Sequence, residues 1–200
     1  MKDTKITKED VIRDFILGKS EELFVRHGFE KTSMDMIARE CDLSKPTLYN
    51  YFQGKNDLFM DVHVRLHERI NDIILEVLKQ DKDRLAVLKE IVDATVRLVG
   101  EHREFLRVFN REYHHLTHEN LSEHIDWSIT NRKTMSGVLT RFLDRIVQAE
   151  VKKRFDIESV SCFILSLFDV LFFDLAVNES DQVATYKELL FYILKRSVLK

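Results

Sequence analysis

Apolar residues recur at three- and four-residue steps along most of the chain, which is the spacing of amphipathic α-helices. One proline and five glycines in 200 residues leave few interruptions between these stretches. The pattern predicts an all-α fold of about nine helices. The predicted helices span residues 7–27, 32–41, 44–52, 56–79, 83–100, 103–113, 121–150, 157–178 and 181–199.

Residues that favour helix ends mark the first two helices. Thr7 followed by Asp10 is a variant capping box, in which each side chain satisfies a backbone N–H of the first turn. Gly28 suits the position just after a helix and predicts that the first helix stops there. Either Thr32 or Ser33 can cap the second helix.

The third predicted helix is short and begins at Ser44, with Pro46 in the first turn, where the missing N–H costs nothing. A helix of two turns is unstable alone in water, so Leu48 and Phe52 must hold it against its neighbours. Two short helices joined by a tight turn and braced by a longer one describe a helix-turn-helix. A generic three-helix corner without a ligand fits the pattern equally well.

The outward residues of this short helix suit a DNA groove. Lysine can donate to guanine, asparagine can pair with adenine, and threonine can meet a thymine methyl group. Tyrosine hydroxyls, the capping serines and helix N-termini can hold phosphates, and Lys55 can neutralise one more. The candidates from this argument are Ser33, Ser44, Lys45, Thr47, Tyr49, Asn50 and Lys55.

Bulk charge gives no sign of a nucleic-acid partner. The net charge is −3, and residues 1–60 contain ten Lys and Arg against eleven Asp and Glu. Phosphate contacts must therefore come from locally placed groups rather than a broad positive field. The same balance keeps open an interaction protein whose helix-turn-helix no longer binds DNA.

Three ordered motifs stand in the N-terminal part of the chain: Phe24-x-x-x-Gly28-Phe29, Thr32-Ser33-Met34-x-x-Ile37-Ala38 and Leu43-Ser44-Lys45-Pro46-Thr47-Leu48-Tyr49-x-Tyr51-Phe52-x-x-Lys55-x-x-Leu58. Through these motifs the sequence resembles the TetR family of bacterial transcriptional regulators. The resemblance covers roughly residues 10–60 and departs mildly from the family pattern at Ser20 and Asn50.

This resemblance implies a helix-turn-helix DNA-binding domain over residues 1–55 and a ligand-sensing and dimerisation domain over residues 56–200. It implies a homodimer that binds double-stranded DNA and a helical C-terminal domain that senses a small molecule. It also adds two recognition-helix positions that usually touch DNA, Pro46 and Tyr51. Lys55 falls at a position that usually meets a phosphate.

The helix over residues 157–177 is apolar on nearly every side, so it must be buried on more than one face. Asp169 and Asp174 would each cost roughly 2.5–3.5 kcal/mol near a bilayer centre, which argues against a membrane span. We expect one face on the chain's own core and the other on a partner, and the family resemblance implies that this helix and the last one form a four-helix dimer interface; packing within a monomer is the alternative. The predicted interface residues are Phe163, Val170, Phe173, Val177, Tyr186, Leu190, Ile193 and Leu194.

Aromatic and histidine side chains of the C-terminal part are candidates for a ligand pocket, although aromatic residues at helical spacing more often fill a core. His114, His115 and His118 raise the idea of a metal site, but no Glu or Cys completes a ligand pattern, so no metal is predicted. The pocket candidates are His63, His67, His102, Phe105, Phe109, Tyr113, Trp127 and Phe163.

No paired carboxylates, Ser/His/Asp order or phosphate-binding loop stands at a useful spacing, so a helical enzyme is the weaker alternative. Cys41 and Cys162 fit free thiols in a reducing cytosol, and the N-terminus has no apolar signal segment. The sequence predicts a cytoplasmic regulator without a cofactor. The family resemblance further implies a repressor, released from a palindromic operator by a small, largely apolar or aromatic ligand.

Overall fold

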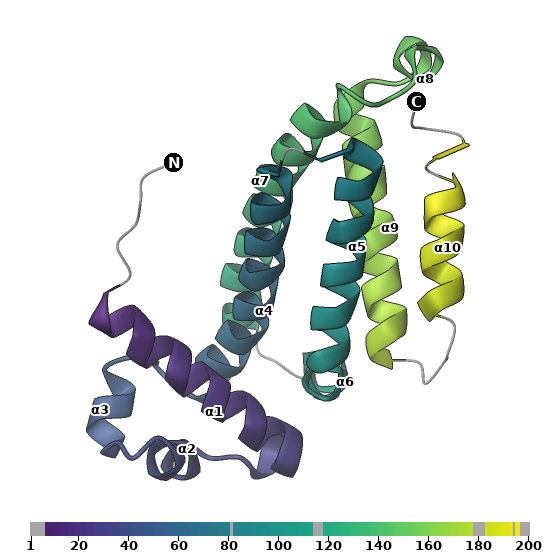
Figure 1. Cartoon of the computed structure of the whole chain (residues 1–200). Helices are drawn as coiled ribbons and strands as arrows, with labels where there is room; N and C mark the ends of the chain where they lie inside the picture. The colour runs from purple at the N-terminus through teal and green to yellow at the C-terminus, as the bar shows by residue number, and fades with distance from the viewer. Residues whose placement is uncertain (1–6, 81, 114–117, 178–182, 194, 197–200) are drawn as a thin grey trace. The chain divides into compact units, whose positions relative to one another are not determined.

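The computed structural model describes residues 7–80, 82–113, 118–177, 183–193 and 195–196, apart from the side chains of residues 84, 118–123, 171–172, 175–177 and 183–184. Within these ranges the secondary structure is helical and contains no strand, which confirms the predicted all-α fold (Figure 1). The helices are α1 (Lys8–Lys31), α2 (Met34–Glu40), α3 (Lys45–Tyr49), α4 (Lys55–Leu78), α5 (Arg84–Glu101), α6 (Arg103–Glu112), α7 (His118–Leu143), α8 (Ala149–Arg154), α9 (Ile157–Val177) and α10 (Val183–Ile193).

The chain forms two compact units. The N-terminal unit contains Met1–Glu68 and Glu104–His124, and the C-terminal unit contains Arg69–Arg103 and Ile125–Lys200. Both α4 and α7 pass from one unit into the other along the chain. The predicted domain boundary after residue 55 falls at the start of α4 and stays a prediction.

The first helix begins where its capping residues predict, but it ends later than predicted. Asp10 N donates to Thr7 Oγ1 at 3.1 Å, and Thr7 N donates to Asp10 Oδ2 at 2.9 Å, so the capping box is confirmed. The backbone bond from Thr7 lowers the pKa of the Asp10 carboxyl. Gly28 has a φ of 77°, a left-handed conformation that breaks the helix and suits a residue without a side chain. The predicted stop at Gly28 is therefore a kink, after which one more helical turn reaches Lys31.

The core of the N-terminal unit is built around Phe24. Its ring centroid lies 6.0 Å from that of Phe29, 4.9 Å from that of Phe59 and 6.5 Å from that of Phe105. Residues of α1, α4 and α6 thus share one aromatic cluster. The buried Ser20 hydroxyl fits the same core because it donates to the Ile16 carbonyl at 2.7 Å.

The C-terminal unit contains α5, α9 and α10, which lie side by side with α9 packed against both neighbours (Figure 1). Its core includes buried residues of α5, α7 and α9, among them Val92, Leu143 and Ile164. Within the part of the chain that the structure describes, no helix is long and apolar enough to cross a bilayer.

The predicted single helix over residues 121–150 is wrong. Helix α7 ends at Leu143. The Leu143 carbonyl accepts hydrogen bonds from the backbone N–H groups of Ile146 and Val147, both at 2.9 Å. Leu143, Ile146 and Val147 are buried together. Their spacing of three and four residues resembles that of a helix, although the backbone forms a turn here. Helix α8 then starts at Ala149.

Candidate nucleic-acid interface

Helices α2 and α3 form the predicted helix-turn-helix. Ser33 Oγ accepts from Met36 N at 3.3 Å at the start of α2, and Ser44 Oγ accepts from Thr47 N at 3.2 Å at the start of α3. The turn between them passes through Asp42, whose φ of 54° lies in the left-handed region. Leu43 N donates to the carbonyl of residue 38 at 2.8 Å and closes the turn.

The outer side of α3 is polar and accessible. Lys45, Pro46, Tyr49 and Asn50 are exposed, whereas Leu48 on the opposite side is fully buried. The other residues predicted to contact DNA, apart from Lys55, differ in exposure. Ser33 and Ser44 are exposed, whereas Thr47 and Tyr51 are half-buried.

The helix is shorter than predicted. It ends at Tyr49, because Asn50 is its C-cap residue and donates its backbone N–H to the carbonyls of Pro46 and Thr47 at 3.2 Å. The chain then turns, with Phe52 N donating to the Leu48 carbonyl at 3.1 Å, so that Phe52 remains buried without extending the helix.

Arg13 of α1 holds the end of this segment and was not singled out from sequence. Its guanidinium donates to the Tyr51 carbonyl at 2.9 Å, pairs with the Asp61 carboxylate of α4, and lies 4.4 Å from the centroid of the Phe52 ring. One side chain therefore connects α1, the segment after α3, and α4. The partners lie 38 and 48 residues away along the chain, so local sequence patterns could not show them.

Lys55, predicted to meet a phosphate, lies against the end of α1. Its ammonium donates to the Phe29 carbonyl at 2.9 Å and lies 4.2 Å from the centroid of the Phe29 ring. It also lies 3.4 Å from the Glu30 carbonyl oxygen. A cation here interacts favourably with the carbonyl end of a helix, where the Phe29 carbonyl also accepts from Thr32 N at 3.3 Å. The phosphate contact stays a prediction.

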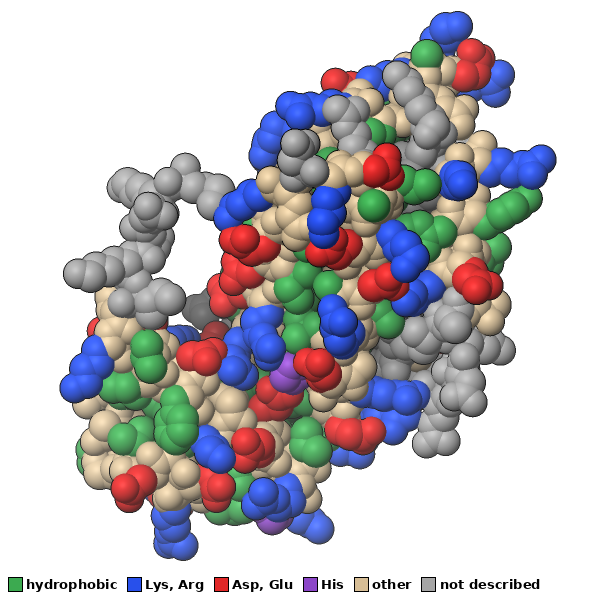
Figure 2. All heavy atoms as spheres, in the orientation of Figure 1, with side chains coloured by type: hydrophobic (Ala, Val, Ile, Leu, Met, Phe, Trp, Pro, Cys, Tyr) green, Lys and Arg blue, Asp and Glu red, His purple; other side chains and the backbone are tan. Residues whose placement is uncertain are grey.

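Lys45 forms an ion pair that links the first turns of α2 and α3. Its Nζ lies 2.8 Å from Asp35 Oδ1, and this hydrogen bond raises the pKa of the ammonium. Both side chains are about half exposed, at 52% and 55%. The region around the first three helices shows acidic and basic side chains interspersed (Figure 2), in keeping with the near-neutral charge of residues 1–60.

Five of the pocket candidates meet in the N-terminal unit. The ring of His63 stacks on Phe109 with centroids 3.9 Å apart and planes 5° apart, and His67 lies 4.7 Å from His63. Tyr113 lies 5.3 Å from Phe109, which in turn lies 6.1 Å from Phe105. We call these residues, with His124, the histidine–aromatic cluster.

His124 of α7 completes this cluster and was not predicted. Its Nε2 lies 3.1 Å from Nδ1 of His63, a hydrogen bond in which one ring donates to the other. Burial, followed by the neighbouring His67, lowers the pKa of His124 to about 4. Burial also holds the pKa of His63 well below its usual value. Both rings are therefore uncharged near neutral pH.

The remaining pocket candidates lie in the C-terminal unit. His102 accepts a hydrogen bond from Arg69 at 2.8 Å, Trp127 is half-buried on α7, and Phe163 is 63% exposed on α9. His114 and His115 and the side chain of His118 lie outside the described residues. Among the side chains that the structure describes, no group of three or more His, Cys, Asp or Glu is placed to hold a metal ion.

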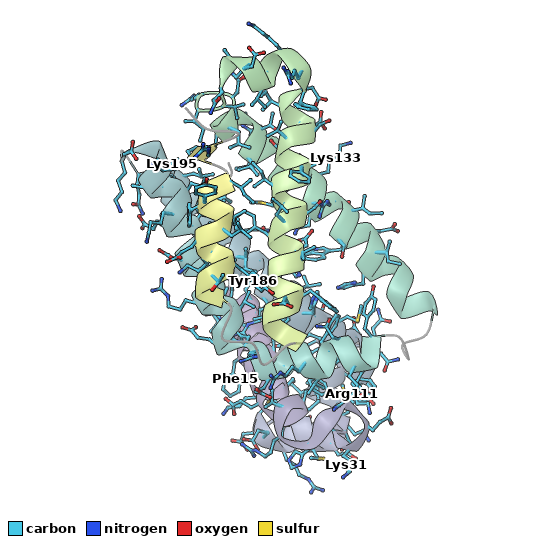
Figure 3. The ribbon with its side chains drawn as sticks, turned by 90° about the vertical axis from the view of Figure 1, so that its right-hand side faces the viewer. Phe15, Lys31, Arg111, Lys133, Tyr186 and Lys195 are labelled. Atoms are coloured by element: carbon cyan, nitrogen blue, oxygen red, sulfur yellow. The ribbon has the colours of Figure 1, made fainter. Side chains whose placement is uncertain are left out.

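Helices α9 and α10 present an apolar surface. Phe163, Val170 and Phe173 of α9 are 59–67% exposed, and Ile193 of α10 is 40% exposed. In Figure 3 these two helices face the viewer with their side chains projecting outward. Of the other predicted interface residues, Tyr186 is half-buried, Leu190 is buried, and the side chains of Val177 and Leu194 lie outside the described residues.

Comparison with known proteins agrees with the helix-turn-helix. Residues 16–62 match the model of the bacterial regulatory proteins of the tetR family. The chain is 28% identical over 105 residues to the HTH-type transcriptional activator FasR of Mycolicibacterium smegmatis, which covers 52% of this chain and 48% of FasR. It thus spans about half the length of that relative.

Other similarities extend over nearly the whole chain. The HTH-type regulator YvdT of Bacillus subtilis is 24% identical over 190 residues, covering 92% of this chain and 93% of YvdT. A TetR-like transcriptional regulator from Rhodococcus sp. RHA1 has the same fold, with a TM-score of 0.64, 21% identity, and coverage of 96% and 97% of the two chains.

The fold and the exposed α3 define a helix-turn-helix protein. Its N-terminal module, residues 16–62, matches the TetR family of bacterial regulatory proteins, and nearly the whole chain is similar to HTH-type and TetR-like regulators. These relatives are regulators rather than enzymes by name, which agrees with the expectation that the chain is not an enzyme.

Proposed function

We propose that the protein is a transcriptional regulator that binds a palindromic operator as a homodimer, with α3 in the major groove. The observation that carries this proposal is the division of α3 into two sides. Leu48 is fully buried, while Lys45, Tyr49 and Asn50 are exposed beside it. These exposed side chains can donate to or accept from base edges, and they sit on a helix held firmly from behind.

Phosphates would be held by local groups, since the N-terminal unit has no excess of positive charge. Backbone N–H groups at the starts of α2 and α3, where Ser33 and Ser44 cap the helices, would hold phosphates. Such contacts fix the register of a protein on DNA without reading its sequence. Arg13 would keep the α3 segment in place while these contacts form.

The homodimer is proposed to form through the apolar surface of α9 and α10. Large exposed apolar patches on a single protomer mark interaction sites, and a self-complementary face gives a two-fold pair. A two-fold pair presents two α3 helices to DNA. They would read half-sites about 34–36 Å apart, one turn of the duplex, so the operator would be a palindrome.

The effector is proposed to be a small, largely apolar or aromatic molecule that binds near the histidine–aromatic cluster and releases DNA. Phe105 and Phe109 of α6 pack in the same core as Phe24 of α1 and Phe59 of α4. A molecule that shifts α6 would therefore disturb the support of α1 and α4. It would act as an inducer if it bound the DNA-free conformation more tightly than the DNA-bound one.

The repressor role is part of the proposal, although FasR is named an activator. Transcription from a promoter bearing the enriched operator tests it, because added protein should lower the transcript level. Activation of that promoter would contradict the repressor role and leave DNA binding intact.

Selection of bound sequences from a random duplex library tests the DNA-binding step. We expect the purified protein to enrich a palindrome and to protect two half-sites one helical turn apart in a footprint. Binding should weaken steeply with salt, because phosphate contacts release counterions. If no sequence were enriched, the proposal would fail, and the helix-turn-helix would serve another kind of interaction.

A further inference from the structure

We infer that Asp35 is a specificity-determining residue. It forms with Lys45 an ion pair of zero net charge, which offers a donor and an acceptor to bases and lowers the affinity for DNA of the wrong sequence. The inference deepens the proposed function and rests on it. It assigns a role in recognition to a carboxylate of α2, next to the helix that carries the other candidate base contacts.

The placement of the pair carries the inference. Asp35 lies in the first turn of α2 and Lys45 is the first residue of α3, and their charged atoms are 2.8 Å apart. Both side chains are about half exposed. Asp35 also follows the Ser33 cap by two residues, beside the backbone N–H groups proposed to hold a phosphate.

Charge neutrality determines the behaviour on DNA of the wrong sequence. Non-specific binding comes almost entirely from cations that neutralise phosphates. With Asp35 beside it, Lys45 adds no net charge to the surface, so its share of that binding is cancelled. Residues 1–60 contain nearly equal numbers of acidic and basic residues. No surrounding excess of positive charge therefore replaces the attraction to phosphates that the ion pair removes.

The same pair suits base edges. An ammonium can donate to guanine O6 and N7, and a carboxylate can accept from the amino group of cytosine. The ion pair also restrains the flexible lysine chain before DNA arrives, which reduces the rotamer entropy lost on binding. At the operator both groups would be satisfied, whereas along other DNA the carboxylate would face phosphates.

The test compares Asp35→Asn with the wild type on two duplexes of equal length, the enriched operator and a scrambled sequence. We expect Asp35→Asn to bind the scrambled duplex about three- to tenfold more tightly, with a salt slope steeper by about 1.8, or about 0.9 for the Lys45 of each protomer. The ratio of operator to scrambled affinity should fall at least threefold. An unchanged affinity for the scrambled duplex, or an equal gain on both duplexes, would overturn the inference.

Glu22→Gln is the matched control. Glu22 pairs with Lys19 on α1 at 3.1 Å, so this variant makes the same charge change beside another lysine of the same unit. Its affinity ratio should stay within twofold of the wild type. A fall equal to that of Asp35→Asn would show that net charge alone is responsible, and would overturn the inference.

A double-mutant cycle with Lys45→Gln tests whether Asp35 acts through Lys45. If the pair is the working unit, Asp35→Asn should change scrambled-duplex affinity less when Lys45 is absent. An undiminished gain would contradict the pair mechanism. A wild-type protein without sequence preference would instead disprove the proposed function itself, so the two failures are distinguishable.

Discussion

Two exposed surfaces of the protein differ in chemistry. The outer side of α3 is polar and small, and the buried Leu48 and Phe52 support it from behind. The surface of α9 and α10 is apolar, with Phe163, Val170 and Phe173 mostly exposed. A polar face with both donors and acceptors suits a hydrated, charged partner such as DNA, whereas an apolar face gains most from a protein partner that excludes water. Exposure alone therefore does not define a site; the exposed chemistry indicates the partner.

The largest effect should come from the buried side of α3. Leu48→Ala should lower the free energy of unfolding by about 2–5 kcal/mol, because it leaves a cavity where the side chain is fully buried. Urea denaturation followed by circular dichroism measures this loss. Tyr49→Ala, one residue along and 45% exposed, should cost less than about 1 kcal/mol. Equal losses in the free energy of unfolding for the two variants would contradict the division of α3 into a buried and an exposed side.

On the other surface, Val170→Glu combined with Phe173→Glu should weaken the dimer at least about a hundredfold, because charge would be buried against an apolar partner. Sedimentation equilibrium measures the dissociation constant. Val25→Glu, an exposed valine of α1, provides the control and should leave the dimer unchanged. A wild-type monomer at micromolar concentration would reject the proposed interface before any variant is made.

A smaller, pH-dependent effect should arise in the histidine–aromatic cluster. The folded protein lowers the pKa of His63 and of His124, so the unfolded chain binds more protons between pH 6.5 and about 4. Stability should be fully present above pH 6.5 and should fall progressively as the pH approaches 4, because both histidines must take up protons that the fold disfavours.

Urea denaturation at a series of pH values measures this dependence, and His124→Gln should make it shallower. A slope that is identical in the variant and the wild type would contradict the role given to His124.

The smallest effect should come from the end of α1. Thr7→Ala removes the capping hydroxyl and should cost about 1 kcal/mol, while Thr7→Asp should keep most of the stability because aspartate also caps helices. Thermal unfolding of both variants checks the difference. If the two substitutions destabilised the protein equally, the capping interaction would not be the cause.

Local signals in the sequence were enough to predict much of the N-terminal unit. Thr7, Ser33 and Ser44 cap helices where their residue types predict, and Gly28 interrupts α1 with a positive φ. Each of these features depends on groups within four residues. The burial of Leu48 and Phe52 also followed from their spacing on a short helix.

Features that depend on distant partners were missed. The ion pair of Asp35 and Lys45 and the bonds of Arg13 join separate helices, and His124 meets His63 across 61 residues. The break after Leu143 was missed for another reason. It has neither proline nor glycine, and buried apolar residues continue through the turn.

The central claim is that the outer side of α3 binds DNA. Fluorescence anisotropy with the enriched duplex tests it most directly, by comparing the wild type with a variant that carries both Tyr49→Ala and Asn50→Ala. The account predicts that the variant keeps its fold and its dimer but binds at least about a hundredfold more weakly, through the loss of contacts from each half of the pair. Wild-type affinity in a folded, dimeric variant would contradict it.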